Sequence, residues 1–558
     1  MPLQALDPSA FARWRAATLA PFAHRVFAVF WWATLISSLG SLMQSVGAAW
    51  LMATIAPSAD RVALVQTAGA LPFFFFSLVA GAYADTHDRR LIMLLSQFLM
   101  LAAAATLALL TLLGHVTPEL LLGLTFLIGC GTAAFAPAWQ ASIGDQVPRE
   151  LIPSAVMANA VGFNMARSVG PAIGGVIVAA SGAAAAFVIN AVSYLGTLGA
   201  LFWWRPVRPR NELPPEPLGA AIAAGARYVR LSPHLTAILA RCALFAVPMA
   251  AAPALMPIVA RDLLGGGAPT YGLLLGAFGI GAMGSALSSA TLRTRFSSDR
   301  LLRVAAGMAS VALFAIGQSR WLALTLLAHL LAGSVWTLAL ANFNIAVQLS
   351  SPRWVMGRTL AMYQTVAFAG IAVGSWIWGL VGHAFGIRES LTVAAGASLI
   401  TLLVARWIPV SVATAGSYDP HVRSQMVEPK FPIHPASGPV IVTIEYRVQS
   451  SNAVRFVALI NELGRIRRRD GARWWSVCQD IDDPNTWIER FESPTWIDYL
   501  RRQSRPTRAD QDVRQQVSKL IEGGRGTGRR FLQRPRGAEP LGESQQRHDP
   551  VERPSDHA

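Results

Sequence analysis

The sequence predicts an all-α membrane protein with twelve transmembrane helices in two six-helix halves, followed by a small α+β domain. Three observations support this fold class. Only 14% of the 558 residues are charged and 53% are apolar, whereas soluble domains carry about 25% charged residues. The apolar residues are concentrated between residues 25 and 410. Arginines gather in alternate gaps between the apolar segments, as they do around membrane-spanning helices.

The apolar segments have the length of membrane spans. A helix that crosses a bilayer needs about 20 predominantly apolar residues, and a proline-rich segment after the sixth candidate divides the spans six and six. The twelve predicted spans are 26–48, 62–84, 91–113, 119–140, 154–180, 183–204, 235–258, 269–291, 300–318, 321–348, 359–383 and 388–409.

The placement of arginine predicts the orientation of these spans. Cytoplasmic loops carry an excess of Lys and Arg. With the N-terminus inside, the outer loops hold only Arg61, Arg261, Arg320 and Arg388, while the inner segments hold several times as many. The N-terminal segment lacks the cleavage site of a signal peptide. We therefore expect a multi-pass protein of the bacterial inner (plasma) membrane with both termini in the cytoplasm.

Composition divides the chain further. The predicted parts are an N-terminal cytoplasmic segment (1–24), a first six-helix bundle (25–204), a cytoplasmic linker (205–233), a second six-helix bundle (234–410), a linker (411–437), a soluble domain (438–522) and a disordered tail (523–558).

Charge and cysteine content argue against other classes of protein. The net charge of +16 comes mostly from inner loops and the tail, so the positive-inside rule accounts for it and we expect no nucleic-acid partner. The three cysteines, Cys130, Cys242 and Cys478, have no metal-site or disulfide spacing. We expect no metal and no cofactor.

A charged loop separates the second and third predicted spans. Its sequence is Gly81-Ala-Tyr-Ala-Asp85-Thr-His-Asp-Arg89-Arg90. It resembles the loop motif of the major facilitator superfamily of transporters, where a glycine precedes an aspartate and paired basic residues. The resemblance implies that Gly81, Asp85, Arg89 and Arg90 form a latch that stabilises the outward-facing state. Two positions depart from the family pattern, and a simple charged turn is the alternative.

The fifth span is rich in small residues. It contains Gly162 and then Gly170-Pro171-Ala-Ile-Gly174-Gly175. Glycines four apart allow close helix packing, and a proline removes one helical hydrogen bond. The segment resembles the motif that marks exporters of the superfamily; generic small-residue packing is the alternative. The neighbouring run from 135 to 159 looks like the enterobactin exporter and macrolide efflux branch.

Arg167 is the strong charge well inside a predicted span. An unpaired arginine at that depth costs at least about 2.5–3.5 kcal/mol, so it should face the interior. It is either a substrate or coupling site for an anionic group, or a structural partner of Asp85 or Asp145. Arg241 is expected to snorkel to the interface. No span has a carboxylate at its centre, so proton coupling is implied by the family resemblance alone.

Uncharged amides complete the candidate site. Amide side chains inside spans bond between helices or to a substrate. The candidates are Gln44, Asn164, Asn190, Asn342 and Gln364.

The C-terminal segment predicts a soluble domain. Strands are expected at 439–447, 472–479 and 486–492, and helices at 452–469, 494–503 and 507–522. This β-α-β-β-α pattern resembles the dimeric α/β barrel of small monooxygenase-like modules, a ferredoxin-like arrangement, although a final strand is not evident. The resemblance implies a homodimer through this domain. No nucleophile–base pair stands out among Glu445, Tyr446, Trp474, Trp475 and Glu489, so we expect no enzyme activity.

Together these features predict a secondary transporter that exports small molecules, drug-like or siderophore-like, with protons as the coupling ion and the lipid bilayer as its surroundings. Two alternatives stay open: an importer of the same fold, and a membrane-anchored enzyme or sensor that acts through the C-terminal domain.

Overall fold

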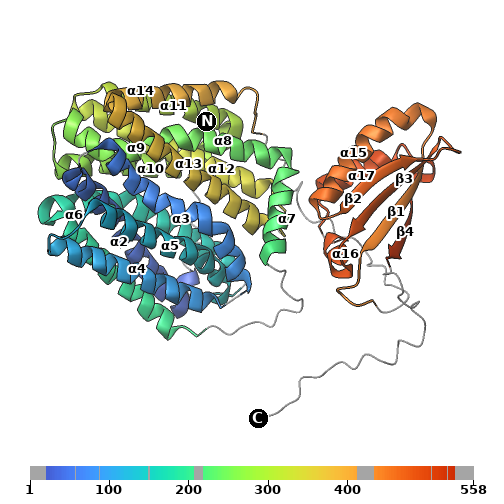
Figure 1. Cartoon of the computed structure of the whole chain (residues 1–558), viewed down its shortest axis with the longest axis horizontal. Helices are drawn as coiled ribbons and strands as arrows, with labels where there is room; N and C mark the ends of the chain where they lie inside the picture. Colours follow the sequence, from blue (N-terminus) through green and yellow to red (C-terminus); the bar gives the residue numbers. More distant parts are fainter. Residues whose placement is uncertain are drawn as a thin grey trace, which may run out of the picture. The chain divides into compact units, whose positions relative to one another are not determined.

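The computed structural model describes residues 20–56, 58–86, 88–148, 151–205, 218–352, 354–410, 433–503, 505–524 and 526–533. The chain forms two compact units, which Figure 1 shows. The first is a helical bundle of residues up to 226, 233–350 and 356–412; the second contains residues from 413 onward together with two short earlier segments, 227–232 and 351–355.

Five long helices build the first half of the bundle: α2 (Arg25–Ile55), α3 (Ala59–Thr86), α4 (Arg89–Leu112), α5 (Pro118–Ser142) and α6 (Ile152–Trp203). Polar caps begin two of them. The Asp88 carboxylate accepts a hydrogen bond from the Arg90 amide, and the Thr117 hydroxyl accepts one from the Leu120 amide. Each cap satisfies an amide that the first helical turn leaves unpaired.

Helix α6 reverses direction at Gly182, where the backbone has φ 77° and ψ 171°. This conformation is essentially limited to glycine. The contacts with α2 show the reversal: Trp31 donates to the Ala158 carbonyl before the break, and Thr197 donates to the Ala33 carbonyl after it. The two arms of α6 therefore run in opposite directions along α2, as expected for a fifth and a sixth span.

The second half follows the linker. Its elements are α7 (Leu218–Arg230), α8 (Pro233–Met249), α9 (Ala251–Ile258), the π-helical η4 (Val259–Leu263), α10 (Ala268–Arg295), α11 (Ser298–Gln318), α12 (Leu322–Leu349), α13 (Met356–Phe385) and α14 (Ile387–Val404). Helix α7 lies within the segment predicted as a linker. The predicted seventh span corresponds to one candidate membrane span, Pro233–Leu263, which contains Pro248 and comprises α8, α9 and η4.

Hydropathy and length identify ten candidate membrane spans among the described residues. One of them, Ser154–Trp203, is long enough for two spans and contains the break at Gly182. Helix α3 has 28 residues but is not among the ten. A membrane-spanning helical bundle is therefore confirmed, while the count of twelve stays a prediction.

The bundle has two ends. We call the first end the one formed by the α2–α3, α4–α5, η4–α10, α11–α12 and α13–α14 connections, and the second end the one where α2, α4, α8, α11 and α13 begin. The helices run side by side between these ends (Figure 1). The two halves meet most extensively where α6 packs on α10 and α3 packs on α13, and α9 also contacts α3 and α2.

The second unit is built on a four-stranded antiparallel sheet with strand order β2-β3-β1-β4. The strands are β1 (Val440–Arg447), β2 (Arg473–Gln479), β3 (Thr486–Ser493) and β4 (Thr527–Leu532), and the helices are α15 (Ala453–Arg469), α16 (Trp496–Gln503) and α17 (Arg508–Ser518). The first three predicted strands are confirmed. Strand β4 was not predicted. It lies in the segment predicted to be disordered, so the domain extends beyond its predicted boundary.

The helices of the second unit cover one face of the sheet. Phe456 of α15 and Val517 of α17 pack on Tyr446 and Trp487, and Tyr499 of α16 packs in a second cluster with Phe491. Alternate strand residues point to opposite faces. Glu445, Ile488 and Arg490 therefore lie on the face that these helices leave uncovered.

Two earlier segments complete the second unit. Tyr228 and Trp354 form an edge-to-face pair with ring centroids 5.4 Å apart. The Arg469 guanidinium lies 4.9 Å from the centre of the Tyr228 ring, and that of Arg505 lies 4.1 Å from the Trp354 ring. Cation–π contacts of this kind contribute about 0.5–2 kcal/mol each. Residues predicted as part of a linker and of a loop thus belong to the folded core of this unit.

Candidate transport site

Two polar contacts join the halves at the first end. Arg261 donates from Nη1 to the Ala53 carbonyl at 2.5 Å, and Asp262 holds its guanidinium in place. The His383 Nδ1 atom lies 3.6 Å from Asp60 Oδ1. Because the members of each contact come from different halves, these contacts close the bundle at its first end.

Close helix packing reinforces this closure. A Cβ on Gly379 of α13 would lie 3.1 Å from the Asp60 Cα of α3, and one on Gly382 would lie 3.2 Å from the Ala59 Cβ. Contacts this short leave no room for a larger side chain without a shift of the helices. The first end is therefore shut by close helix packing as well as by the polar contacts.

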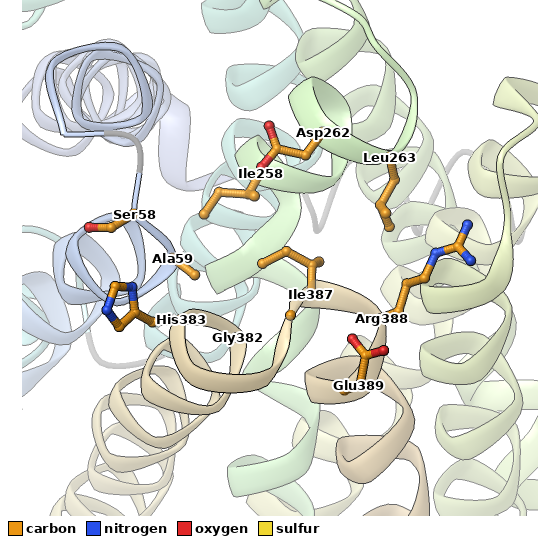
Figure 2. Close-up of a pocket in the computed structure, with 11 residues that line it drawn as sticks. Ser58, Ala59, Ile258, Asp262, Leu263, Gly382, His383, Ile387, Arg388 and Glu389 are labelled. Carbon is orange, nitrogen blue, oxygen red and sulfur yellow. The ribbon is translucent and has the colours of Figure 1, made fainter.

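A pocket of about 420 Å³ lies beside these contacts (Figure 2). Figure 2 shows His383 on the side of Ser58 and Ala59, with Arg388 and Glu389 on the opposite side. The pocket takes residues from both halves. It is small and lies at the closed end, so we do not place the main substrate site there.

Further contacts between the halves lie deeper in the bundle. Trp50 and Tyr271 stack with centroids 5.8 Å apart. The Thr67 hydroxyl donates to the Ala372 carbonyl at 3.0 Å. Phe73 and Phe368 stack at 4.1 Å. These contacts form the wall between the first end and the middle of the bundle.

Arg167 lies halfway along the first arm of α6, between Ile152 and Gly182. Among the described residues it has no carboxylate partner, and its electrostatic neighbour is Tyr363 of α13, in the other half. The Tyr363 hydroxyl donates to the Leu340 carbonyl at 2.8 Å. The guanidinium thus faces the interface of the halves at mid-depth. The alternative partner Asp145 pairs with Arg89 instead, at 3.1 Å.

The candidate amides fall into different surroundings. Gln44 and Asn190 are buried and bonded to each other, and Tyr194 also bonds Asn190. Asn342 donates to the Leu338 carbonyl at 2.7 Å, while its Oδ1 is buried without a partner. Gln364 is half-buried next to Tyr363, whereas the Asn164 side chain lies outside the described structure. Gln364 therefore lies beside the pair of Arg167 and Tyr363, while Asn342 offers an unsatisfied acceptor inside the second half.

The glycines of the predicted exporter motif contact two helices. A Cβ on Gly162 would lie 3.1 Å from the Trp31 ring, one on Gly170 would lie 3.0 Å from Leu42, and one on Gly174 would lie 2.8 Å from the Met43 Cα. All three partners are on α2. Gly175 instead packs on Gly272 of α10, in the other half. With Pro171 inside the helix, the motif fits α6 tightly against both neighbours.

The predicted latch is partly described. Gly81 and Asp85 belong to α3, but the Asp85 side chain lies outside the described structure. Arg89 pairs with Asp145 of η2 (Ile143–Asp145), and Arg90 donates from Nε to the Leu201 carbonyl at 2.8 Å. A cation at the carboxyl end of a helix is favourable because that end carries partial negative charge. Both arginines therefore anchor the start of α4 within the first half.

One buried polar residue was not predicted from the sequence, and another lies in surroundings that differ from the prediction. His329 of α12 is fully buried, with Nδ1 2.8 Å from the Thr325 carbonyl and Nε2 without a partner. Arg241 was predicted to snorkel, but it is buried and pairs with Asp299 at 3.1 Å. A scan for charged residues inside spans overlooks His329, because histidine is not counted as charged, and it cannot show that Arg241 finds a carboxylate partner on another helix.

In the second unit, Glu489 is the centre of a closed polar network. It accepts hydrogen bonds from Tyr446 at 2.7 Å, from Trp475 at 2.8 Å and from Arg467 at 2.5 and 3.0 Å. Burial alone raises the pKa of this carboxyl group, but Arg467 outweighs burial and lowers it. Since all of its acceptor capacity is used, Glu489 supports the fold rather than offering a base to a substrate.

A buried cation lies near this network. Arg502 stacks on Phe491, with its guanidinium carbon 4.3 Å from the ring centre. Its Nε and Nη2 have no hydrogen-bond partner. Burial and the nearby Arg467 lower the pKa of Arg502 to about 9. Among the described residues, no group of three or more His, Cys, Asp or Glu is placed to hold a metal.

The chain is similar to known membrane transporters. Residues 16–534 match the family described as "Transmembrane secretion effector" (MFS_3). The chain is 26% identical over 366 residues to the multidrug efflux pump Tap of Mycolicibacterium fortuitum, covering 62% of this chain and 87% of Tap. It is 25% identical over 374 residues to the uncharacterized MFS-type transporter YfiS of Bacillus subtilis (strain 168), covering 64% and 86%.

Solved structures share the fold of the bundle. The crystal structure of a bacterial homolog of the human lysosomal transporter Spinster, inward-facing and unoccupied, matches with a TM-score of 0.56 and 15% identity. The match covers 70% of this chain and 96% of that chain. At this identity the likeness concerns the fold alone.

Proposed function

Because the chain belongs to the transmembrane secretion effector family of major facilitator superfamily transporters, we propose that it exports small molecules from the cytoplasm, driven by the proton gradient. It is a membrane transporter and not an enzyme, because the members of its family and the solved structures that share its fold are transporters. The efflux-pump name of the relative Tap favours export over import. The earlier resemblance to the enterobactin and macrolide exporters favours drug-like or siderophore-like substrates.

The observation that carries this proposal is the position of Arg167. It lies at mid-depth, opposite Tyr363 of the other half, without a carboxylate partner among the described residues. Transporters of this architecture bind substrates at the interface of their halves near the bilayer midplane. A buried guanidinium there favours a substrate with an anionic group. Asn342 and Gln364 are the amides we propose to orient it.

We further propose that the second end faces the cytoplasm and that the chain spans the inner membrane twelve times. Taking the two arms of α6 as separate spans and counting α3 gives this number. The positive-inside rule favours this orientation. Closure of the first end then supports a state closed to the outside. In this scheme Gly81, Asp85, Arg89 and Arg90 act as a latch between states.

A homodimer through the sheet domain is a further part of the proposal. The uncovered face carries Glu445, Ile488 and Arg490, so charges of both signs lie beside an apolar residue and suit a second copy of the same face. Light scattering of the purified protein should give the mass of a dimer. A monomer that persists at micromolar concentration would contradict this part alone.

Cellular accumulation of labelled drugs and siderophores tests the transport proposal. Cells with the intact protein should retain less of a substrate than cells without it, and a proton ionophore should abolish the difference. Arg167→Ala should lose export of anionic substrates at normal insertion, while Arg300→Ala, at the second end, should retain it. Higher accumulation with the intact protein would favour import, and full activity of Arg167→Ala would remove this residue from the mechanism.

A further inference from the structure

An apolar groove of about 1000 Å³ runs along α6, α10 and α12. Its lining consists only of Ala, Gly, Val, Pro, Leu and Ile residues. Val176, Ile280 and Leu327 on its walls are 60–68% exposed. All three helices are candidate membrane spans, so side chains this exposed and this apolar face the hydrocarbon of the bilayer.

The groove is shared by the two halves of the bundle. One wall comes from α6 of the first half, and the other from α10 and α12 of the second. The helices meet at Gly175 and Gly272, where a Cβ on Gly272 would lie 3.0 Å from the Gly175 Cα. Two glycines thus let α6 and α10 touch backbone to backbone. Any motion of one half against the other changes the shape of the groove at this crossing.

The position of the groove selects its occupant. Pro269 and Ala323 of the lining stand at the starts of α10 and α12, at the first end. Arg320 and Trp321, both exposed, directly precede α12. Tryptophan and arginine at a helix end are typical anchors at the headgroup level of a membrane. A molecule with a hydrocarbon chain in the groove would place a polar head beside them.

We propose that this groove binds an acyl chain of a phospholipid from the leaflet at the first end, with its phosphate beside Arg320. An acyl chain gains no hydrophobic free energy when it moves from the bilayer into an apolar groove, because both surroundings are apolar. The affinity of the lipid for the groove must therefore come from close packing and from the contact of its phosphate. An acyl chain that touches both halves when the first end is closed binds this closed state more tightly than a state in which the first end is open. It therefore shifts the equilibrium toward closure.

Photo-crosslinking of the full chain in lipid nanodiscs tests the proposal. The probe is an anionic phospholipid with a diazirine in its acyl chain, and the sites are mapped by mass spectrometry. Labelling should concentrate on segments 172–180, 269–280 and 323–330. Gly276→Leu, which fills the groove, should lower it at least fivefold, whereas Leu287→Phe on the exposed face of the same helix should not change it.

Additional variants and competitors keep the outcomes distinct. Ala179→Leu, at an exposed position of α6, fills the groove from the other half if Gly276→Leu fails to fold. Arg320→Ala should lower labelling by the anionic probe. Equal labelling of the groove and of the Leu287 face would overturn the proposal. Displacement of the probe by one of the drugs or siderophores of the accumulation assay would also overturn it, because the groove would then bind those compounds rather than lipid. None of these readouts requires transport, so they stand or fall apart from the export proposal.

Discussion

Glu489 is the single residue on which the sheet domain depends most clearly. Its folded pKa is lowered because Arg467 outweighs the effect of burial. A carboxyl group with a lowered folded pKa stabilises the fold above its unfolded pKa, near 4.5, and this stabilisation disappears as the pH falls through the folded value. Stability of the domain should therefore fall on acidification below about pH 4.5.

Replacing Glu489 with glutamine tests this network. Glu489→Gln leaves Arg467 buried without its counter-charge, which typically costs about 3–5 kcal/mol. We expect residues 433–533 of the full chain to be digested by a protease at pH 7 much faster than in the wild type, with a weaker further loss at acid pH. Glu445→Gln, on the uncovered face of the sheet, is the control. Equal resistance of Glu489→Gln and the wild type would show that the network does not stabilise the domain.

Single residues were predicted from the sequence to different degrees. Arg167 was identified because a charge inside an apolar segment is conspicuous, and the structure places it between the halves. Its neighbour Tyr363 was not, since a tyrosine in a span gives no signal without a partner. The contact of Asp60 with His383 could not be predicted either. The two residues are more than 300 positions apart in sequence, and only the folded chain brings them together.

At the scale of elements, the glycines of α6 decide how closely it packs on α2. A Cβ on Gly174 would lie 2.8 Å from the Met43 Cα, which is backbone and cannot rotate away. We expect Gly174→Ala to push the helices apart at a cost of about 1–3 kcal/mol, as overpacking does. Thermal unfolding of the purified protein and its transport rate are the measurements, and both should decrease.

The same helix provides a matched control. A Cβ on Gly196 would meet nothing within 4 Å, and alanine favours helix over glycine by about 1 kcal/mol. Gly196→Ala should therefore be neutral or stabilising. If Gly174→Ala unfolded at the same temperature as Gly196→Ala, close packing of α6 on α2 would not be a source of stability.

Elements with a strong apolar pattern were the predictable ones. The long helices and strands β1 and β3 follow from apolar length and from β-branched residues. Strand β4, with the sequence Thr-Gly-Arg-Arg-Phe-Leu, was not predicted, because the strand itself is mostly polar and its neighbours in sequence are rich in glycine and arginine. It forms by backbone pairing along β1, with Val442 opposite Arg530. Pairing at the edge of a sheet leaves little trace in side-chain composition.

At the scale of the whole molecule, the division into two halves could be predicted from the sequence, whereas the contacts between them could not. Span count, loop charge and the proline-rich linker are all local properties. The closure at the first end depends instead on the packing of α3 against α13 and of α6 against α10. Such packing depends on the combined shapes of many small side chains, which no short motif encodes.

A reversible cross-link across the first end tests whether this closure opens during transport. A Cβ on Gly382 would lie 3.2 Å from the Ala59 Cβ. A disulfide needs about 3.8 Å between these atoms, so it requires the helix ends to move apart by a few tenths of an ångström. The double variant combines Ala59→Cys with Gly382→Cys, and Cys478→Ser removes the exposed native thiol. We expect this protein to stop transporting when it is oxidised and to recover when it is reduced. Each single cysteine variant should be indifferent to oxidant.

The two outcomes separate two kinds of transporter. Arrest on oxidation means that α3 and α13 must part at the first end once per cycle, as alternating access through a rocking interface requires. Continued transport by the oxidised protein, with the cross-link verified by mass spectrometry, would mean that these helix ends stay together throughout. The substrate would then have to leave along another path, and the groove between α6 and α10 is the place where the two halves also meet.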